Sequence, residues 1–230
     1  MKLPEPMVNR LIDSSIPDEL YAIEATIIAN RPEYKNNGQR RDWKASVYRE
    51  IVHRKGSEFL DCGGRYCGLP SVFFDKIFLD CYPLVCGADC FETDPSNFKR
   101  MELFYNNTIG KETRFCDYAG DIILHKADVL DLAAHNPNTK YKLIDIDSNG
   151  VLIVERVKLI AQLAIIHADT QCILTVWNPY ARAITKEKHE VLVNFLDELL
   201  KKDFNIVLSG HKEYMETSPM YCKHLFLERK

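Results

Sequence analysis

From residue 58 onward, short apolar runs alternate with longer segments in which apolar residues recur at helical spacing. Short runs bounded by turn residues predict strands, and the longer segments predict helices. Predicted strands are Phe59–Asp61, Leu84–Phe91, Ile122–Lys126, Lys142–Ile146, Cys172–Trp177, Phe204–Ser209 and Cys222–Glu228. Predicted helices lie near Pro70–Asp80, Ser96–Asn106, Val154–Ile166 and Lys186–Lys202. This alternation indicates a doubly wound α/β sheet.

The end of the chain departs from this alternation. After Lys202 a strand, a polar turn with Ser218 and Pro219, and a second strand follow without a helix between them. Two strands joined in this way predict a terminal hairpin, which places one antiparallel strand in an otherwise parallel sheet. A seven-stranded sheet closed by a hairpin separates one class of Rossmann-like domain from the dehydrogenases.

We divide the chain into a helical, basic N-terminal extension at residues 1–56 and an α/β domain at residues 57–230. Two helices are predicted in the extension, Asp18–Ala29 and Trp43–Val52. In the first of them Asp18 is a plausible N-cap.

The most basic part of the chain is the segment Arg31–Lys55, in which Tyr34, Trp43 and Tyr48 stand among the cations. Basic residues bind phosphates and aromatic rings stack on unpaired bases, so this segment is a candidate nucleic-acid interface. The candidate contacts are Arg40, Arg41 and Lys44. The alternative is a solvated linker and an amphipathic helix on the domain edge.

Composition narrows the class of protein. A net charge of −3 carries no global signature of a nucleic-acid binder, so such a surface would be local. No apolar run approaches the ~20 residues that span a bilayer, and no secretory signal is visible. We therefore expect a soluble, intracellular protein, cytoplasmic by default, without a membrane partner. Without a secretory signal, disulfides between the eight cysteines are not expected, and most of these cysteines stand in apolar runs, where a reduced thiol is a small apolar group. No CxxC pair is present, which argues against a metal site.

The stretch from Glu58 to Phe74 combines an apolar run with a glycine-rich turn. Glycines at a strand-to-helix turn let the backbone approach a ligand, and the helix N-terminus favours polar or anionic groups. The candidate ligand contacts in this stretch are Asp61, Gly63, Gly64 and Gly68.

Acids follow the next two predicted strands. Glu92 and Asp94 stand at the tip of the second strand, where a carboxylate can accept two hydrogen bonds from a ribose diol. Glu92 is the first choice and Asp94 the second. The alternative role of Asp94 is local, because Asp94-Pro-Ser begins a predicted helix that either Asp94 or Ser96 would cap. After the third strand, Asp128 lies where a side chain could bond an adenine amino group, with a solvated acid or a cap as the alternative.

The fourth strand carries Asp145 and Asp147, which the two-residue period of a strand places on one face. Burying carboxylates costs free energy unless a partner compensates, so both acids are candidate catalytic residues. Asn149 follows them as a candidate substrate contact. After the fifth strand, Asn178 and Tyr180 are candidate pocket-lining residues, with a simple turn as the alternative.

Taken in order, four motifs resemble those of the class I S-adenosylmethionine-dependent methyltransferases. These motifs are Asp61-Cys-Gly-Gly, Glu92-Thr-Asp-Pro, Ala127-Asp-Val-Leu-Asp-Leu and Leu143-Ile-Asp-Ile-Asp-Ser-Asn-Gly. Within the class, the last three are similar to motifs of the tRNA guanosine N2,N2-dimethyltransferases. The family motif after the fourth strand is Asp-x-Asp-Pro-Phe-Gly, where this chain has Ser148-Asn149 in place of Pro-Phe.

The resemblance implies S-adenosylmethionine as cofactor. It implies that Asp61, Gly63 and Gly64 line the methionine side, Glu92 binds the ribose and Asp128 lies near the adenine. Asp147 would contact the amine that is methylated. We therefore expect a methyltransferase acting on an amine of a nucleic-acid base, RNA rather than DNA. The alternatives are a catalytically degenerate methyltransferase-like binding or assembly module, and a methyltransferase for a small molecule or a protein.

Overall fold

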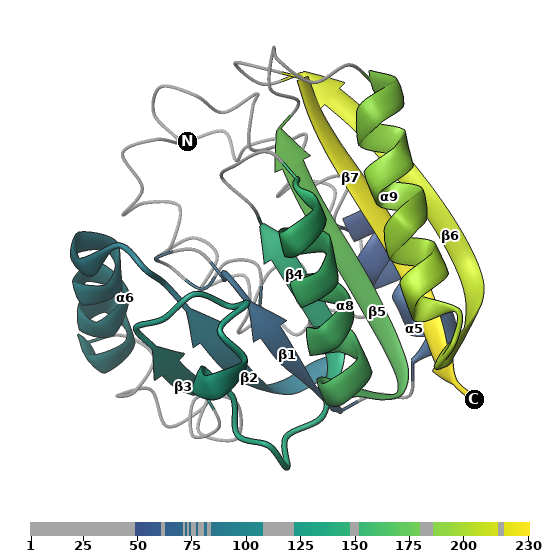
Figure 1. Cartoon of the computed structure of the whole chain (residues 1–230). Helices are drawn as coiled ribbons and strands as arrows, with labels where there is room; N and C mark the ends of the chain where they lie inside the picture. Colours follow the sequence, from purple (N-terminus) through teal and green to yellow (C-terminus); the bar gives the residue numbers. More distant parts are fainter. Residues whose placement is uncertain are drawn as a thin grey trace, which may run out of the picture.

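In the part of the chain that the structure describes, seven strands form one sheet in the order β3-β2-β1-β4-β5-β7-β6 (Figure 1). The strands are β1 Gly64–Gly68, β2 Val85–Phe91, β3 Ile122–His125, β4 Tyr141–Asp147, β5 Ala168–Pro179, β6 Phe204–Met215 and β7 Pro219–Arg229. Strands β1 to β5 pair in parallel with their neighbours. Strand β7 is antiparallel to both β5 and β6. The predicted α/β sheet with a terminal antiparallel hairpin is therefore confirmed.

The computed structural model describes residues 49–60, 63–70, 72, 74, 77, 81, 84–107, 122–147, 152–179, 186–215 and 219–230. The predicted helix Asp18–Ala29 and most of the basic segment lie outside the described residues. The same holds for six of the candidate site residues: Arg40, Arg41, Lys44, Asp61, Asn149 and Tyr180.

Helices cover both faces of the sheet (Figure 1). Helices α8 (Val154–His167) and α9 (Lys186–Leu200) cover one face and build a core with β4, β5 and β7. The π-helix η1 (Arg49–Lys55), α5 (Gly56–Phe59) and α6 (Pro95–Asn107) belong to the other face. After β3 the chain forms only a short 3₁₀ turn, η5 (Leu132–Ala134), before β4 begins.

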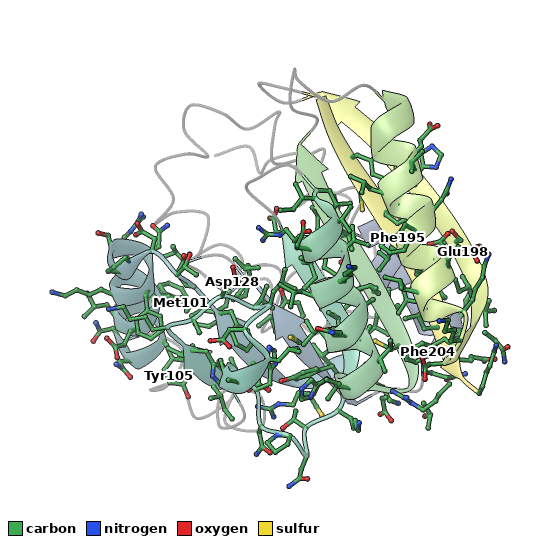
Figure 2. All side chains as sticks on the ribbon, viewed as in Figure 1. Met101, Tyr105, Asp128, Phe195, Glu198 and Phe204 are labelled. Carbon is green, nitrogen blue, oxygen red and sulfur yellow. The ribbon has the colours of Figure 1, made fainter. Side chains whose placement is uncertain are left out.

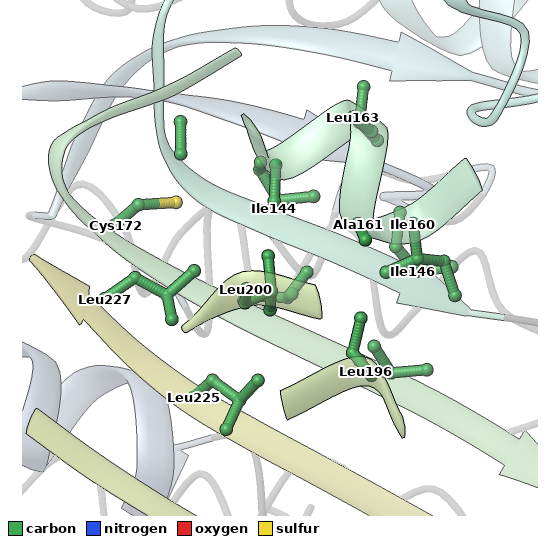
Figure 3. Packing of buried hydrophobic residues seen from close by; sticks show 14 of the residues in the cluster. Ile144, Ile146, Ile160, Ala161, Leu163, Cys172, Leu196, Leu200, Leu225 and Leu227 are labelled. Atoms are coloured by element: carbon green, nitrogen blue, oxygen red, sulfur yellow. The ribbon is translucent and has the colours of Figure 1, made fainter. Parts of the chain in front are cut away.

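The hydrophobic pattern explains why these elements form. Strand β4 is apolar on both faces, with Leu143, Ile144 and Ile146 fully buried, as expected for a parallel strand covered by helices on each side. Helix α9 buries a stripe that includes Leu196 and Leu200, which pack against the sheet (Figure 3). Each such buried leucine contributes about 1.5–3 kcal/mol relative to an exposed one.

Six of the seven predicted strands are confirmed, although β5, β6 and β7 extend beyond the predicted bounds. Helices α6, α8 and α9 confirm three predicted helices, and most of the fourth, near residues 70–80, lies outside the described residues. The two hairpin strands extend into residues whose polar composition is typical of a turn. They can do so because β6 and β7 pair as far as Met215 and Pro219, which satisfies the backbone hydrogen-bonding groups of both strands.

The predicted first strand is wrong. Phe59 ends helix α5, and β1 begins only at Gly64. Glycine is depleted in strands, so the segment Gly-Arg-Tyr-Cys-Gly has no strand signature of its own. Gly64 belongs there because β4 passes very close: a Cβ atom at this position would lie 2.4 Å from the Cβ of Lys142.

Cysteine burial matches the expectation from the sequence. Among the described residues, Cys67, Cys81, Cys90, Cys172 and Cys222 are buried free thiols and Cys86 is exposed. Burial raises the pKa of Cys67 and Cys90 well above the usual thiol value, so these residues stay protonated and behave as small apolar groups. No helix in the described part of the chain is long and apolar enough to cross a membrane.

The hairpin contains a buried histidine that lacks, within the described part of the chain, a hydrogen-bond partner on one ring nitrogen. His224 of β7 is 3% exposed, and its Nδ1 has no hydrogen-bond partner among the described residues. Its ring occupies the space above Gly210, where a Cβ atom would lie 2.4 Å from Nε2. Burial, together with the positive charges of Lys55, Lys223 and Lys212, lowers the pKa of His224 from 6.5 to about 4.

We predict an acid-sensitive stability that depends on His224. Since the pKa is lower in the folded than in the unfolded protein, stability falls as the pH drops from 6.5 toward 4, by up to roughly 3 kcal/mol. Urea unfolding of His224→Phe between these pH values should show a smaller loss than the wild type. If the free energy of unfolding fell as steeply with pH in His224→Phe as in the wild type, the prediction would be refuted.

Candidate functional site

The carboxyl ends of β1, β2 and β4 meet at one edge of the sheet. Gly68, the last residue of β1, pairs with Cys90 of β2 on one side and Asp145 of β4 on the other. Glu92 and Asp147 each follow two residues after these partners, so both lie at the edge beside the end of β1. In a sheet of this topology, this edge is where ligands bind.

The three described candidates of the first turn, Gly63, Gly64 and Gly68, do not lie together. Gly68 is at the carboxyl end of β1, whereas Gly63 and Gly64 are at its amino end, on the opposite edge of the sheet. Gly68 has no room for a side chain, because a Cβ atom would lie 2.3 Å from the carbonyl oxygen of Asp145. Asp61 is outside the described residues. The turn nearest the ligand edge is therefore Gly68-Leu69-Pro70.

Glu92 is held by backbone groups on both sides. Its amide N–H donates to the carbonyl oxygen of His125 at 3.1 Å, which ties the end of β2 to the end of β3. Its carboxylate Oε1 accepts from the amide of Asp94 at 2.8 Å. The side chain is half-buried, so its carboxylate is oriented and still reaches solvent.

Asp94 is the N-cap of helix α6. Its Oδ1 accepts hydrogen bonds from the amides of Ser96 at 2.9 Å and Asn97 at 2.8 Å, two of the donors that a helix start leaves unpaired. Of the two roles considered for Asp94, capping is the one with observed contacts.

Asp128 lies in the segment that joins β3 to β4, and its exposed side chain is labelled in Figure 2. Its Oδ1 accepts from the amide of Leu130 at 2.9 Å, which closes a local turn. Asp131, three residues on, caps η5 by accepting from Ala133 at 3.1 Å. Asp128 is therefore an oriented carboxylate shortly after the end of β3.

The two acids of β4 have different surroundings. Asp145 is fully buried, and its carboxylate accepts from Thr175 Oγ1 at 2.7 Å, Trp177 Nε1 at 2.6 Å and Tyr66 Oη at 3.1 Å. Asp147, at the last position of the strand, is half-buried. The two acids therefore lie at different depths: Asp145 lies beneath the edge of the sheet and Asp147 lies on it.

Asp145 joins three strands through its donors, since Tyr66 belongs to β1 and Thr175 and Trp177 belong to β5. Burial, and then the charge of Asp145, raise the pKa of Tyr66 well above its usual value. The phenol therefore stays protonated and remains a donor.

Asn178 lies near the end of β5, paired with Tyr221 of β7. Its backbone thus belongs to the sheet, and the simple turn considered for this residue does not begin before Pro179.

One set of interacting side chains, which joins three neighbouring strands, was not predicted from the sequence. Asp89 of β2 is 3% exposed and lies between Arg65 of β1, whose Nε is 2.5 Å from Oδ2, and His125 of β3, whose Nε2 is 2.7 Å from Oδ1. Burial would raise the pKa of Asp89, but the hydrogen bonds from His125 and Arg65 outweigh it and lower the pKa. The available signal was an acid inside an apolar strand, the same signal that singled out Asp145.

The strand order, with the antiparallel β7 inserted between β5 and β6, is that of the class I S-adenosylmethionine-dependent methyltransferases, and the chain has this fold. No protein-family model matches the chain, and neither does any curated protein sequence.

Several solved structures share the fold. The N-methyltransferase NodS from Bradyrhizobium japonicum superimposes with a TM-score of 0.55 and 11% identity, over 85% of this chain and 99% of NodS. An rRNA methylase from Streptococcus thermophilus gives 0.51 and 10%, over 78% and 94% of the two chains. M. jannaschii TYW2 in complex with AdoMet gives 0.50 and 14%, over 78% and 76%. At these identities the likeness concerns the fold.

We predict that Asp145 matters for stability through its acceptor atoms. In Asp145→Leu, three buried donors lose their acceptor, and we expect a loss of roughly 3 kcal/mol or more in the free energy of unfolding. Asp145→Asn is the matched control, because its amide oxygen can still accept from Thr175 and Trp177 and its NH₂ can donate to the Tyr66 oxygen. Urea denaturation followed by tryptophan fluorescence should rank the two, and equal losses would contradict the assignment.

Proposed function

We propose that the protein is an S-adenosylmethionine-dependent methyltransferase that acts on an amine of a nucleic-acid base, RNA in preference to DNA. The observation that carries the proposal is the set of acids at the carboxyl edge of a class I methyltransferase sheet. Glu92 and Asp128 follow β2 and β3, and Asp147 is the last residue of β4. This is the order in which the resemblance assigns ribose, adenine and substrate amine.

The residues at this edge fit the proposed cofactor. The carboxylates of Glu92 and Asp128 are oriented by backbone amides and remain accessible, as hydrogen-bond acceptors for a ribose diol and an amino group must be. Gly68 brings the backbone of β1 to the same edge without a side chain. When bound, S-adenosylmethionine supplies a methyl group activated by a positively charged sulfur.

Asp147 is the residue we assign to the amine. Asp145 is buried beneath the edge, where its oxygens accept three hydrogen bonds. Asp147 ends β4 and is only half-buried, so its position at the edge suits a residue that faces a substrate. Accepting a hydrogen bond from the amine would point the nitrogen lone pair at the methyl carbon. As the N–C bond forms and the C–S bond breaks, the carboxylate would take up the proton that the nitrogen loses.

The choice of a nucleic-acid amine has two supports. Two structures with this fold are an N-methyltransferase and an rRNA methylase by name. The basic segment Arg31–Lys55 combines cations with aromatic residues, and its first described residues, in η1, continue into the helical layer packed on the sheet. Contacts from Arg40, Arg41 and Lys44, and from Asn149, Asn178 and Tyr180 beside the amine, are part of the same proposal.

A second candidate is a methyltransferase-fold module that binds a partner without catalysis. The observation that favours it is the turn after β1, where Leu69 and a buried Pro70 follow Gly68 in place of a glycine-rich loop. Isothermal titration with S-adenosylhomocysteine separates the two candidates: binding that Glu92→Ala weakens supports the enzyme, and absence of binding supports the module.

For catalysis we predict that Asp147→Asn slows methyl transfer by roughly 10²–10⁴-fold, because the amide is a poor proton acceptor. The affinity for S-adenosylhomocysteine should stay unchanged. The assay is transfer of labelled methyl groups to total RNA, followed by nuclease digestion to identify the modified base. Asp131→Asn is the control, since Asn caps η5 as well as Asp does. An Asp147→Asn variant as active as wild type would exclude this role.

For substrate binding we predict that replacing both Arg40 and Arg41 by Ala weakens RNA affinity and lowers the slope of log affinity against log salt by about 2. Lys158→Ala on the exposed side of α8 is the control, with no expected effect. Unchanged RNA binding in the double variant would point to a small-molecule or protein substrate instead.

A further inference from the structure

His135 is a buried histidine in the segment between β3 and β4. Its side chain is 6% exposed and lies in a column of aromatic rings. The ring centroid is 4.6 Å from that of Phe91, which itself stacks on His125 at 4.4 Å. The ring of His167 lies 5.1 Å away. Contacts with both rings leave the imidazole of His135 little freedom to rotate.

Hydrogen bonds determine which nitrogen of His135 carries the proton. Nε2 lies 2.8 Å from the carbonyl oxygen of Val129, which can only accept, so Nε2 is protonated and donates. Nδ1 lies 3.2 Å from the hydroxyl of Tyr141, which can donate to it. Burial, the largest effect, lowers the pKa of His135, and this favours the neutral form that such an arrangement requires.

The two main contacts of His135 are with neighbours of the proposed cofactor acids. Phe91, on which the ring packs, directly precedes Glu92. Val129, whose carbonyl accepts from Nε2, directly follows Asp128. One side chain therefore touches both the end of β2 and the turn after β3.

The segment that carries Asp128 has little other regular structure. Between β3 and β4, the structure contains only the three-residue turn η5, so no α-helix fixes the Asp128 turn on the sheet. A second histidine secures the far end of the segment, since Nδ1 of His167 in α8 donates to the carbonyl oxygen of Thr139 at 3.0 Å. Near Asp128, it is His135 that fixes the segment, through its hydrogen bond to the carbonyl oxygen of Val129.

We propose that His135 is a positioning residue that fixes Asp128 and Glu92 relative to each other and thereby sets the selectivity of the site for adenosine. This inference rests on the proposed function, because it assigns the ligand of these two acids. His135 itself touches no cofactor atom. It acts through the Val129 carbonyl and the Phe91 ring.

Two substitutions separate the two contacts. Gln at position 135 can place its amide nitrogen near the position of Nε2, so His135→Gln retains a donor for Val129 and loses the ring. His135→Phe retains a ring to pack on Phe91 and loses the donor. His224→Phe is the matched control, as it removes an equally buried histidine from β7, at the other end of the sheet.

The measurement is a pair of dissociation constants by isothermal titration, for S-adenosylhomocysteine and for S-inosylhomocysteine, in which a carbonyl oxygen replaces the adenine amino group. Wild type should prefer the adenosine compound by roughly 10–100-fold, the value of a hydrogen bond to a charged acceptor. In His135→Phe the preference should fall to about threefold or less, and His135→Gln should retain most of it. The His224→Phe control should keep the wild-type ratio.

Two other results would overturn the inference. If His135→Phe weakens both compounds equally and keeps the wild-type ratio, the residue serves the fold alone. If wild type binds neither compound, the proposed function fails and the inference fails with it. Should His135→Phe not fold, the Nε2 proton of His135 is followed in ¹⁵N-histidine-labelled wild type. A larger shift with the adenosine compound than with the inosine compound supports the inference, and equal shifts refute it.

Discussion

The buried carboxylate of Asp145 is the constraint on which the ligand edge depends. A carboxyl group without exposure to water is tolerated only where hydrogen-bond donors surround it, and here the donors come from β1 and β5. This requirement places Tyr66 and Trp177 in the core with their polar atoms turned toward one point. It also explains why β1 ends in glycine, since the Tyr66 hydroxyl and the backbone of Asp145 occupy the space where a side chain would begin.

A second polar group stabilises the other half of the edge. Helix α8 lies on one face of the sheet, but no α-helix between β3 and β4 covers β1, β2 and β3 there. This part of the face carries Asp89 with its partners Arg65 and His125 in place of a uniformly apolar surface. The rings of Phe91, His135 and His167 then fill the region between Asp89 with its partners and helix α8. Polar contacts and ring stacking together perform the packing that a helix would otherwise provide.

Much of the fold could be predicted from the sequence because buried parallel strands and amphipathic helices have strong periodicities. Strand β4 and helix α9 are examples. The terminal hairpin was predicted because the sequence has no helical pattern between its last two strands. The first strand could not be predicted, since its glycines are explained by the approach of Lys142 and Asp145, contacts between residues far apart in the sequence. For the site, strand-end acids were visible as Glu92, Asp128 and Asp147. The different depths of Asp145 and Asp147, and the role of His135, depend on packing that no local pattern encodes.

The position of β7 has a consequence for how the sheet is assembled. Strand β6 precedes β7 in the chain, yet β7 lies between β5 and β6. Until residues 219–229 have been synthesised, β6 has no neighbour in the sheet and one edge of β5 is open. Pairings between segments distant in sequence form slowly, and an open central strand can pair with another chain. The outer third of the sheet must therefore form late, after β7 has left the ribosome, and a nascent chain stalled before that point would expose β5 to chaperones or to aggregation.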